Sequence, residues 1–225
     1  MRVLAIDTAL EACAAAVLDT EHGTVSSETL PMIRGHAEAL IPLIGRVMRD
    51  ADIPFSALNR IAVTTGPGSF TGLRVGISAA RGIALASGKP VLGLTTLEAF
   101  AAPHIAADKT TAIIVAIDAR HQHVYLQAVG PDGQTIVAPC IAHIADAVRA
   151  AGDAPVRIVG TAANLLAASW PPDQPAPLLV EERRAPDIAW VGRLAAIADE
   201  GFGTPKPLYL RAPDAQPQNA RLPRR

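Results

Sequence analysis

The order of apolar and polar segments along the chain repeats itself, and this repetition limits the possible folds most strongly. The strand-like segments VLAID (3–7) and TAIIVAID (111–118) are both apolar, and both end in an aspartate. Each is followed by two further strand-like segments and then by helical and strand-like segments in turn. The sequence therefore predicts an α/β protein built from two copies of one βββαβαβα unit.

Turn residues and helix signals place the elements of the two units. In the first unit, strands are predicted at 3–7, 13–19, 24–30, 61–65 and 90–94, with helices at 36–50, at 71–87 and from Thr95 onward. Thr95 and Glu98, three residues apart, predict a capping box at the start of the last helix. In the second unit, strands are predicted at 111–118, 123–129, 135–138, 156–160 and 177–180, with helices at 141–151, from Ala162 and at 187–200. The units are therefore expected at 1–104 and 105–204, and the helix 187–200 is free to pack back on the first. Residues 205–225 form a proline-rich tail with a net charge of +4.

The composition favours a globular protein whose helices pack closely on sheets. Half of the residues are hydrophobic, but only 4% are aromatic and 44 are alanine, so small side chains build much of the core. The net charge of −1 gives no reason to expect nucleic acid or a membrane as the main partner. The apolar runs are too short for a membrane span, and Cys13 and Cys140 cannot form a disulfide framework. We therefore expect a cytoplasmic protein.

Two such units facing each other resemble the actin-like ATPase and sugar kinase (ASKHA, ribonuclease H-like) architecture, in which a nucleotide lies in the cleft between the halves. Phosphate binding there needs a glycine-rich turn beside an aspartate that holds Mg²⁺ or a water. Asp7, Thr8, Asp118 and Gly160 are the candidates for such a site. The turn after Thr8 has no glycine, however, and it contains Glu11. An active ATP-binding phosphotransferase or ATPase that uses Asp7, Thr8 and Asp118 is therefore kept as the alternative function.

Metal and nucleophile motifs give little support to other enzymes. His121 and His123 are expected on one face of a strand, but a metal site also needs a third ligand, for which Asp118 or His104 is available. A zinc peptidase would place its histidine pair on a helix, and the sequence has no such pair. Ser69 lacks the GxSxG frame of a nucleophile elbow. We predict no catalytic residue, no cofactor and no metal, and leave a metal at His121 and His123 open.

The most specific string in the chain is GPGSFTGLRVG (66–76). Glycines inside the helix 71–87 cost about 1 kcal/mol each in helix propensity, so a close contact is expected to compensate for them. Gly72, Gly76, Ala80 and Ala84 recur every four residues and would form a smooth groove along one face. The groove would receive either another element of this chain or a second protein, and the pattern leaves both open.

Several strings together identify a family resemblance that covers about residues 1–211. They are AIDT, RGHAEALIPLI, TTGPGSFTGLRVGISAARGIA, GLTTLEAFA, AIDAR followed by VY, and PLYLR. With these strings the chain resembles the TsaB (YeaZ) family. The resemblance implies an actin-like fold without catalytic activity and a role as partner of the related TsaD subunit. That assembly installs threonylcarbamoyl on N6 of adenosine 37 in tRNAs that read ANN codons.

The same resemblance implies the partners and the surface that meets them. TsaD would be the heterodimer partner, a homodimer is possible, the TsaE ATPase would join the larger complex, and tRNA would be contacted only indirectly. Pairing is expected through the helices 36–50 and 71–87. The residues expected at this interface are Leu40, Leu43, Ile44, Val47, Gly72, Leu73, Gly76, Ile77, Ala80, Ile83 and Ala84. In that case, Gly76→Leu or Ala80→Arg would block pairing and leave the fold intact.

Overall fold

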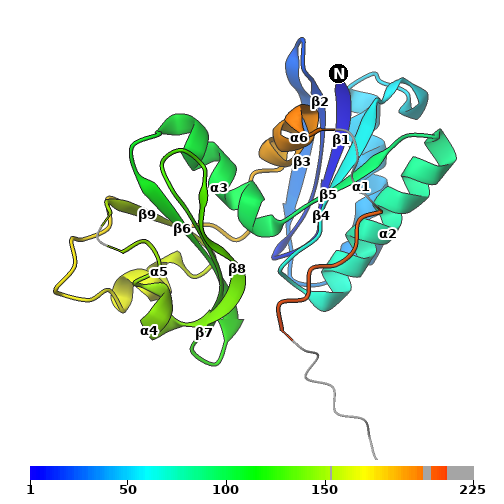
Figure 1. The fold of residues 1–225 in the computed structure, drawn as a ribbon. Coiled ribbons are helices and arrows are strands. Elements are labelled where there is room, and N and C mark those ends of the chain that lie inside the picture. Colours follow the sequence, from blue (N-terminus) through cyan, green and yellow to red (C-terminus); the bar gives the residue numbers. More distant parts are fainter. Residues whose placement is uncertain (153, 200–203, 212–225) are drawn as a thin grey trace, which may run out of the picture.

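The computed structural model describes residues 1–152, 154–199 and 204–211, which form two halves side by side (Figure 1). The first sheet contains β1 (Arg2–Asp7), β2 (Ala12–Asp19), β3 (Gly23–Pro31), β4 (Arg60–Thr64) and β5 (Val91–Leu94), in the order β3-β2-β1-β4-β5. The second contains β6 (Ala112–Arg120), β7 (His123–Val129), β8 (Thr135–His143), β9 (Val156–Gly160) and β10 (Leu179–Glu182), in the order β10-β9-β6-β7-β8.

The two sheets have the same topology. In each, the first three strands pair antiparallel in sequence, and the fourth and fifth continue in parallel on the other side of the first strand. The helices follow the same order in both halves. They are α1 (His36–Asp50), α2 (Phe70–Ser87), α3 (Thr96–Ala107), α4 (Ile144–Ala147), α5 (Ala163–Ala168) and α6 (Ile188–Ile197). The predicted duplicated actin-like unit is confirmed.

Two predicted helices begin at a side-chain cap, and a third predicted helix is only partly helical. The Thr95 hydroxyl accepts from the Glu98 amide while the Glu98 carboxylate accepts from the Thr95 amide, so the predicted capping box is present. Asp187 caps α6 by accepting from the amide of Ala189. The predicted helix 141–151 is reduced to α4. Before it, β8 continues along β7 as far as the pair His123 and His143, and after it the chain forms turns from Val148 onward.

The third helix of each half packs between the two sheets. α3 lies on β6, β7 and β9 of the second sheet, α6 lies on β1, β2 and β4 of the first, and the two helices contact each other (Figure 1). α1 and α2 cover the outer face of the first sheet, and α4 and α5 cover that of the second. The buried Arg60 side chain reaches the last turn of α6, donating to the carbonyl oxygens of Ala195 and Ala198. The helix that begins at Asp187 therefore completes the first half.

The small residues of α2 let it approach the first sheet closely. A Cβ atom on Gly72 would lie 2.1 Å from the carbonyl oxygen of Thr8, and one on Gly76 would lie 2.3 Å from the Thr8 hydroxyl oxygen. Ala80 is fully buried. The stripe of small residues therefore faces the chain's own sheet rather than a partner, which corrects the expectation that filling it would leave the fold intact.

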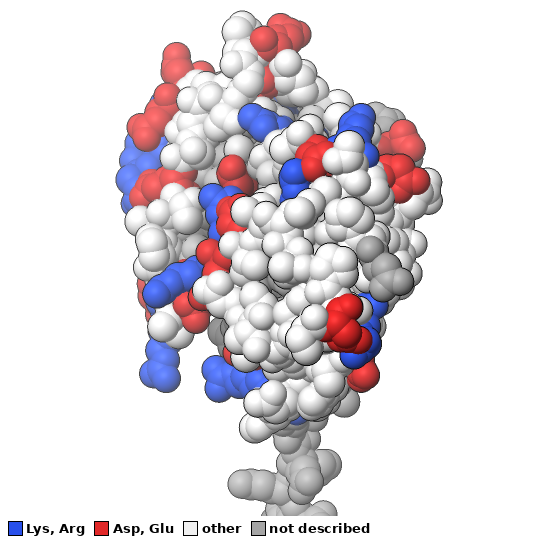
Figure 2. Space-filling model, turned by 90° about the vertical axis from the view of Figure 1, so that its left-hand side faces the viewer, with Lys and Arg blue, Asp and Glu red and all other residues white. Residues whose placement is uncertain are grey.

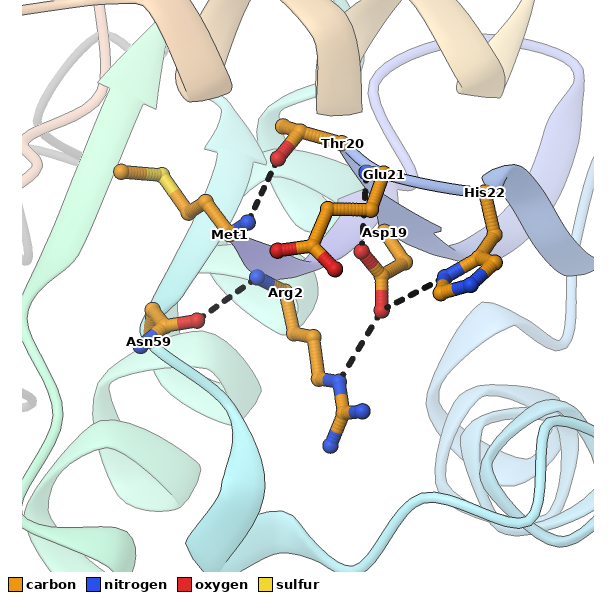
Figure 3. A network of polar contacts seen from close by, with 7 residues as sticks. All are labelled: Met1, Arg2, Asp19, Thr20, Glu21, His22 and Asn59. Atoms are coloured by element: carbon orange, nitrogen blue, oxygen red, sulfur yellow. Dashed lines mark hydrogen bonds and ion pairs between the residues drawn. The ribbon is translucent and has the colours of Figure 1, made fainter.

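The start of the chain is fixed by polar contacts with the β2–β3 turn (Figure 3). The Met1 amino group donates to the Thr20 hydroxyl, and the Arg2 guanidinium donates to the Asp19 carboxylate at 3.1 Å. The amide of Glu21 donates to the other Asp19 oxygen at 3.0 Å. These contacts, first the Glu21 amide and then Arg2, lower the pKa of Asp19 to about 2.

The α2 contact predicts opposite effects for two glycine substitutions. Gly76→Ala should lower the free energy of unfolding by about 1–3 kcal/mol, because Thr8 and α2 must move apart to admit the methyl group. Gly82→Ala is the matched control on the same helix: nothing lies within 4 Å of its added Cβ. It should raise stability by up to about 1 kcal/mol through helix propensity. Urea unfolding of both variants measures this, and a neutral Gly76→Ala would contradict the close packing.

The lowered pKa of Asp19 predicts that the stability of the fold depends on pH. Its pKa is lower in the folded state, about 2, than the ordinary value of 3.8, so the folded state is favoured above that ordinary value. This stabilisation should be lost as the pH falls from about 5 towards 2. Asp19→Asn should therefore be less stable than the wild type at pH 7, with a difference that shrinks on acidification. Glu21→Gln, an exposed neighbour, is the control, and parallel pH profiles for wild type and Asp19→Asn would refute the assignment.

Candidate functional site

The carboxylate of Asp7 lies inside the fold rather than in the cleft. Asp7 is completely buried, and one of its oxygens accepts from the Thr64 hydroxyl and from the Ala9 amide. The other oxygen has no hydrogen-bond partner among the described residues. Burial raises the pKa of Asp7 above its ordinary value, against the effect of these hydrogen bonds. In this structure Asp7 therefore contacts the fold itself, and its carboxylate is not exposed in the cleft.

Thr8 is also used within the fold. It is 1% exposed, and its hydroxyl donates to the carbonyl oxygen of Gly72 at 2.7 Å. The loop before α2 closes over the same turn, since the Ser69 amide donates to the carbonyl oxygen of Ala9 at 2.7 Å. A Cβ on Gly68 would lie 2.2 Å from that oxygen. The glycines of GPGSFTGLRVG thus serve close packing on the β1–β2 turn, and the Ser69 side chain caps α2 by accepting from the Gly72 amide.

The second half places its candidate residues differently. Asp118 is exposed at the end of β6, and its carboxylate accepts from the amide of Arg120 at 2.7 Å. Gly160 is buried with φ +114°, and a Cβ there would lie 2.3 Å from the carbonyl oxygen of Ala116. The close approach of β6 accounts for this glycine without a ligand. Of the four candidates for a nucleotide site, only Asp118 is accessible in the structure.

His121 and His123 do not lie on one strand face. His121 and Gln122 form the two-residue turn between β6 and β7, with φ angles of 51° and 62°. The ring of His123 instead meets that of His143 on β8, with 5.4 Å between ring centres. Within the described ranges, the one group of three possible metal ligands is Asp19, Glu21 and His22, at the other end of β2. Arg2 already contacts its central carboxylate, and this group carries no assignment.

The cleft between the halves contains two polar hollows, with volumes of about 300 and 470 Å³. Both are lined by Glu11 from the β1–β2 turn and by Asp118 and Arg120 from the second half. Across the smaller hollow, the Arg184 guanidinium lies 3.8 Å from the Glu11 carboxylate. A carboxylate thus lines both hollows, and its charge would repel a phosphate group there. The cleft offers mixed charge rather than a phosphate cradle.

A segment near the end of the chain, residues 204–211, crosses from one half to the other, and we call it the strap. Its Leu208 amide donates to the carbonyl oxygen of Thr65 at 2.7 Å. Tyr209 stacks on Phe70 at the start of α2, with ring centres 5.4 Å apart. Arg211 donates to the carbonyl oxygen of Ala119 at 2.9 Å. The strap contains the PLYLR string, the one sign of this contact in the sequence, and residues 212–225 lie outside the described residues.

The residues expected at a partner interface are mostly interior. All are buried except the half-buried Ile83, and they are Leu40, Leu43, Ile44, Val47, Gly72, Leu73, Gly76, Ile77, Ala80, Ile83 and Ala84. They were chosen for their apolar helical spacing, and this spacing marks the face that each helix turns to its own sheet. A partner of α1 and α2 must therefore meet their outward side, where other residues are exposed.

The outward side of α1 and α2 exposes uncharged residues together with charged ones such as Glu38. We define the outer helical surface by its exposed members Ala37, Ile41, Ser78, Gly82, Leu85 and Ala86. Ile41 is 57% exposed and Leu85 is 87% exposed, and large apolar side chains are also exposed elsewhere, as at Ile197. Exposed Arg74 and Arg81 border these residues on α2.

In the part of the chain that the structure describes, no helix has the length and hydropathy needed to cross a membrane.

Comparisons with known proteins agree on one family. The family model for TsaD, described as tRNA N6-adenosine threonylcarbamoyltransferase, matches residues 24–198. The tRNA threonylcarbamoyladenosine biosynthesis protein TsaB of Escherichia coli strain K12 is 38% identical over 125 residues, or 56% of this chain. That match spans 53% of the E. coli protein, so the chain matches about half the length of this relative.

Two further matches cover nearly the whole chain. An uncharacterised protein of Mycobacterium tuberculosis strain H37Rv is 32% identical over 216 residues, which are 96% of this chain and 94% of that protein. The solved structure of YeaZ from Pseudomonas aeruginosa superposes with a TM-score of 0.76 at 26% identity, covering 93% of this chain and 99% of that one. The chain therefore belongs to the TsaB (YeaZ) family.

Proposed function

We propose that this protein takes part in threonylcarbamoyladenosine biosynthesis as a non-catalytic, activating subunit. It would pair with a TsaD subunit that transfers threonylcarbamoyl to N6 of adenosine 37 in ANN-decoding tRNAs. The support for the pathway is the name of the E. coli relative and the description of the matching family model. The observation that carries the subunit role is the outer helical surface, which leaves Ile41 and Leu85 exposed to water.

The interior of the cleft supports the non-catalytic part of the proposal. Asp7 and Thr8, which an actin-like ATPase would direct at its ligand, are buried and hydrogen-bonded within the fold. Glu11 replaces a glycine-rich turn and lies beside Asp118 in both hollows. The chemistry would then belong to the partner, and this chain would stabilise the active arrangement of that partner.

The outer helical surface supports pairing through α1 and α2. Interfaces are enriched in large apolar side chains at their centre and in arginine, and depleted in other charged residues. The outer helical surface fits this composition, with small residues that admit close helix packing and with Arg74 and Arg81 at its border. The partner would be TsaD, a second copy would compete for the same surface, and TsaE would join the larger complex.

The charge distribution supports only indirect contact with tRNA. On the face shown in Figure 2, basic and acidic side chains are interspersed rather than gathered by sign. Nucleic-acid binding surfaces instead gather lysine and arginine, because phosphate neutralisation supplies most of the affinity. We therefore assign tRNA recognition to the partner and place the assembly in the cytoplasm.

The alternative function is an ATP-dependent enzyme, and the cleft hollows with Asp118 and Arg120 are the observation that favours it. Calorimetry of the isolated protein with Mg-ATP separates the two proposals. Micromolar binding that is lost in Asp118→Asn would support the enzyme. Absence of binding to a chain that still activates TsaD would support the subunit role.

Pairing predicts that one charge on the outer helical surface blocks the partner without unfolding the chain. Ile41→Glu should weaken association with TsaD at least about tenfold, because a carboxylate would be buried in an apolar contact without a counterion. Its thermal stability should match that of the wild type, since Ile41 is 57% exposed. Co-purification and analytical ultracentrifugation measure both effects.

The matched control is Ile136→Glu on the second half, where the isoleucine is 48% exposed. This variant should pair normally. Loss of pairing in both variants, or normal pairing of Ile41→Glu, would argue against the outer helical surface as the contact.

A further inference from the structure

A second pocket, outside the cleft, lies where the two crossing helices α3 and α6 meet the second sheet. Its volume is about 330 Å³, the size of small ligand sites. The walls are mostly apolar and include Ala102 and Ile105 from α3, Val129 from β7, and Leu194 from α6. The ring of Trp190 also lines it, held by the Arg193 guanidinium 4.7 Å from the ring centre.

The side chain of Gln127 breaks the apolar pattern of this wall. Tyr125, Gln127 and Val129 alternate along β7, and Tyr125 and Val129 pack in the apolar cluster that contains α3. On β6, the partner of Gln127 in the sheet is Val115. An amide therefore stands where its neighbours on the same face of the sheet are apolar. Such a substitution lowers stability unless the amide finds a partner.

The Gln127 amide has no such partner in the part of the chain that the structure describes. Gln127 is 6% exposed, and its Oε1 atom is buried without a hydrogen bond. Leaving a buried polar atom unpaired is costly. Unlike the unpaired oxygen of Asp7, which lies inside the fold, this one belongs to a side chain that lines a pocket. Because Gln127 lines the pocket, a molecule in the pocket can supply the missing hydrogen bonds when the amide turns about its last torsion.

The chemistry of an amide defines the class of molecule. A glutamine side chain carries a donor beside an acceptor, and it pairs with a flat ring whose edge carries the same two groups in the complementary order. The apolar walls fit the faces of such a ring. Two charged residues also belong to the lining: Glu98 is engaged with Thr95, and Lys109 is exposed to solvent, so no buried charge calls for a charged ligand. We propose that this pocket binds an uncharged, flat heteroaromatic ring with a lactam-type or amidine-type edge, held by Gln127.

The pocket lies between α3 and α6, so a bound ligand would affect how the two halves are held together. α3 belongs in sequence to the first half and packs on the second sheet, whereas α6 belongs to the second half and packs on the first. A ligand between them contacts both crossing helices, so it would stabilise the arrangement of the two halves in which the pocket is formed. This site is independent of the outer helical surface.

The test uses two probe molecules and the full chain. 2-Quinolone is a flat bicyclic lactam with the required edge, and N-methyl-2-quinolone has the same shape without the N–H donor. Titration followed by amide NMR should show weak binding of 2-quinolone, with shifts in β7, α3 and α6. The N-methyl compound should bind about three- to tenfold more weakly, as expected for the loss of one buried hydrogen bond.

Three variants test whether the probes bind in this pocket and contact Gln127. Gln127→Leu keeps the side-chain volume and should remove the difference between the two probes. Ala106→Trp fills the pocket from an exposed position of α3 and should abolish binding, whereas Ala107→Trp, exposed one residue further on and outside the pocket lining, should not. Equal binding of both probes to the wild type would overturn the proposal and indicate that water satisfies Gln127. No shifts at the solubility limit, or unchanged binding to Ala106→Trp, would overturn it as well.

Discussion

The close approach of α2 and its preceding loop to the end of β1 is the constraint on which the rest of this protein depends. Gly68 lies against the carbonyl oxygen of Ala9 and Gly72 against that of Thr8, and neither place has room for a Cβ atom. The contact buries Asp7 and Thr8, so groups that an ATPase would direct at its ligand make hydrogen bonds inside the fold instead. It also turns the opposite side of α2 to solvent. One packing arrangement thus buries Asp7 and Thr8 at the end of β1 and exposes the outer helical surface.

The two halves are joined by more than the chain between them. α3 and α6 each pack on the sheet of the other half and against each other, and Arg60 on β4 reaches the last turn of α6. The strap adds a third connection, from Thr65 in the first half to Ala119 in the second. Enzymes built from two halves around a ligand often close by hinge movement of those halves. Here any opening of the cleft would have to break contacts of the strap and the crossing helices, and this arrangement suits a subunit that presents a fixed surface.

The sequence predicted the parts of the fold that depend on local patterns. The repeated unit followed from the recurrence of apolar strands ending in Asp7 and Asp118, and the start of α3 followed from Thr95 and Glu98. Predictions from the sequence were wrong where contacts between distant segments determine the local structure. β8 extends to His143 because β7 offers it a partner, and His121 lies in a turn rather than on the strand face of His123. The burial of Asp7 could not be predicted, because it depends on a loop that follows almost sixty residues later.

The small residues of α2 made it hard to predict which partner its glycine and alanine face packs against. In a chain with 44 alanines, a stripe of glycine and alanine has the same appearance whether it faces a sheet of its own or another protein. Gln127, in contrast, is conspicuous in the sequence. It places an amide in the segment HVYLQAV, where the other residues on the same face of the strand are apolar or aromatic. Burial of that amide without a partner costs free energy, so the departure requires a physical reason at that one place. In a sequence this rich in small apolar residues, a polar residue inside an apolar segment is therefore a better guide to a candidate binding site than a stripe of small residues.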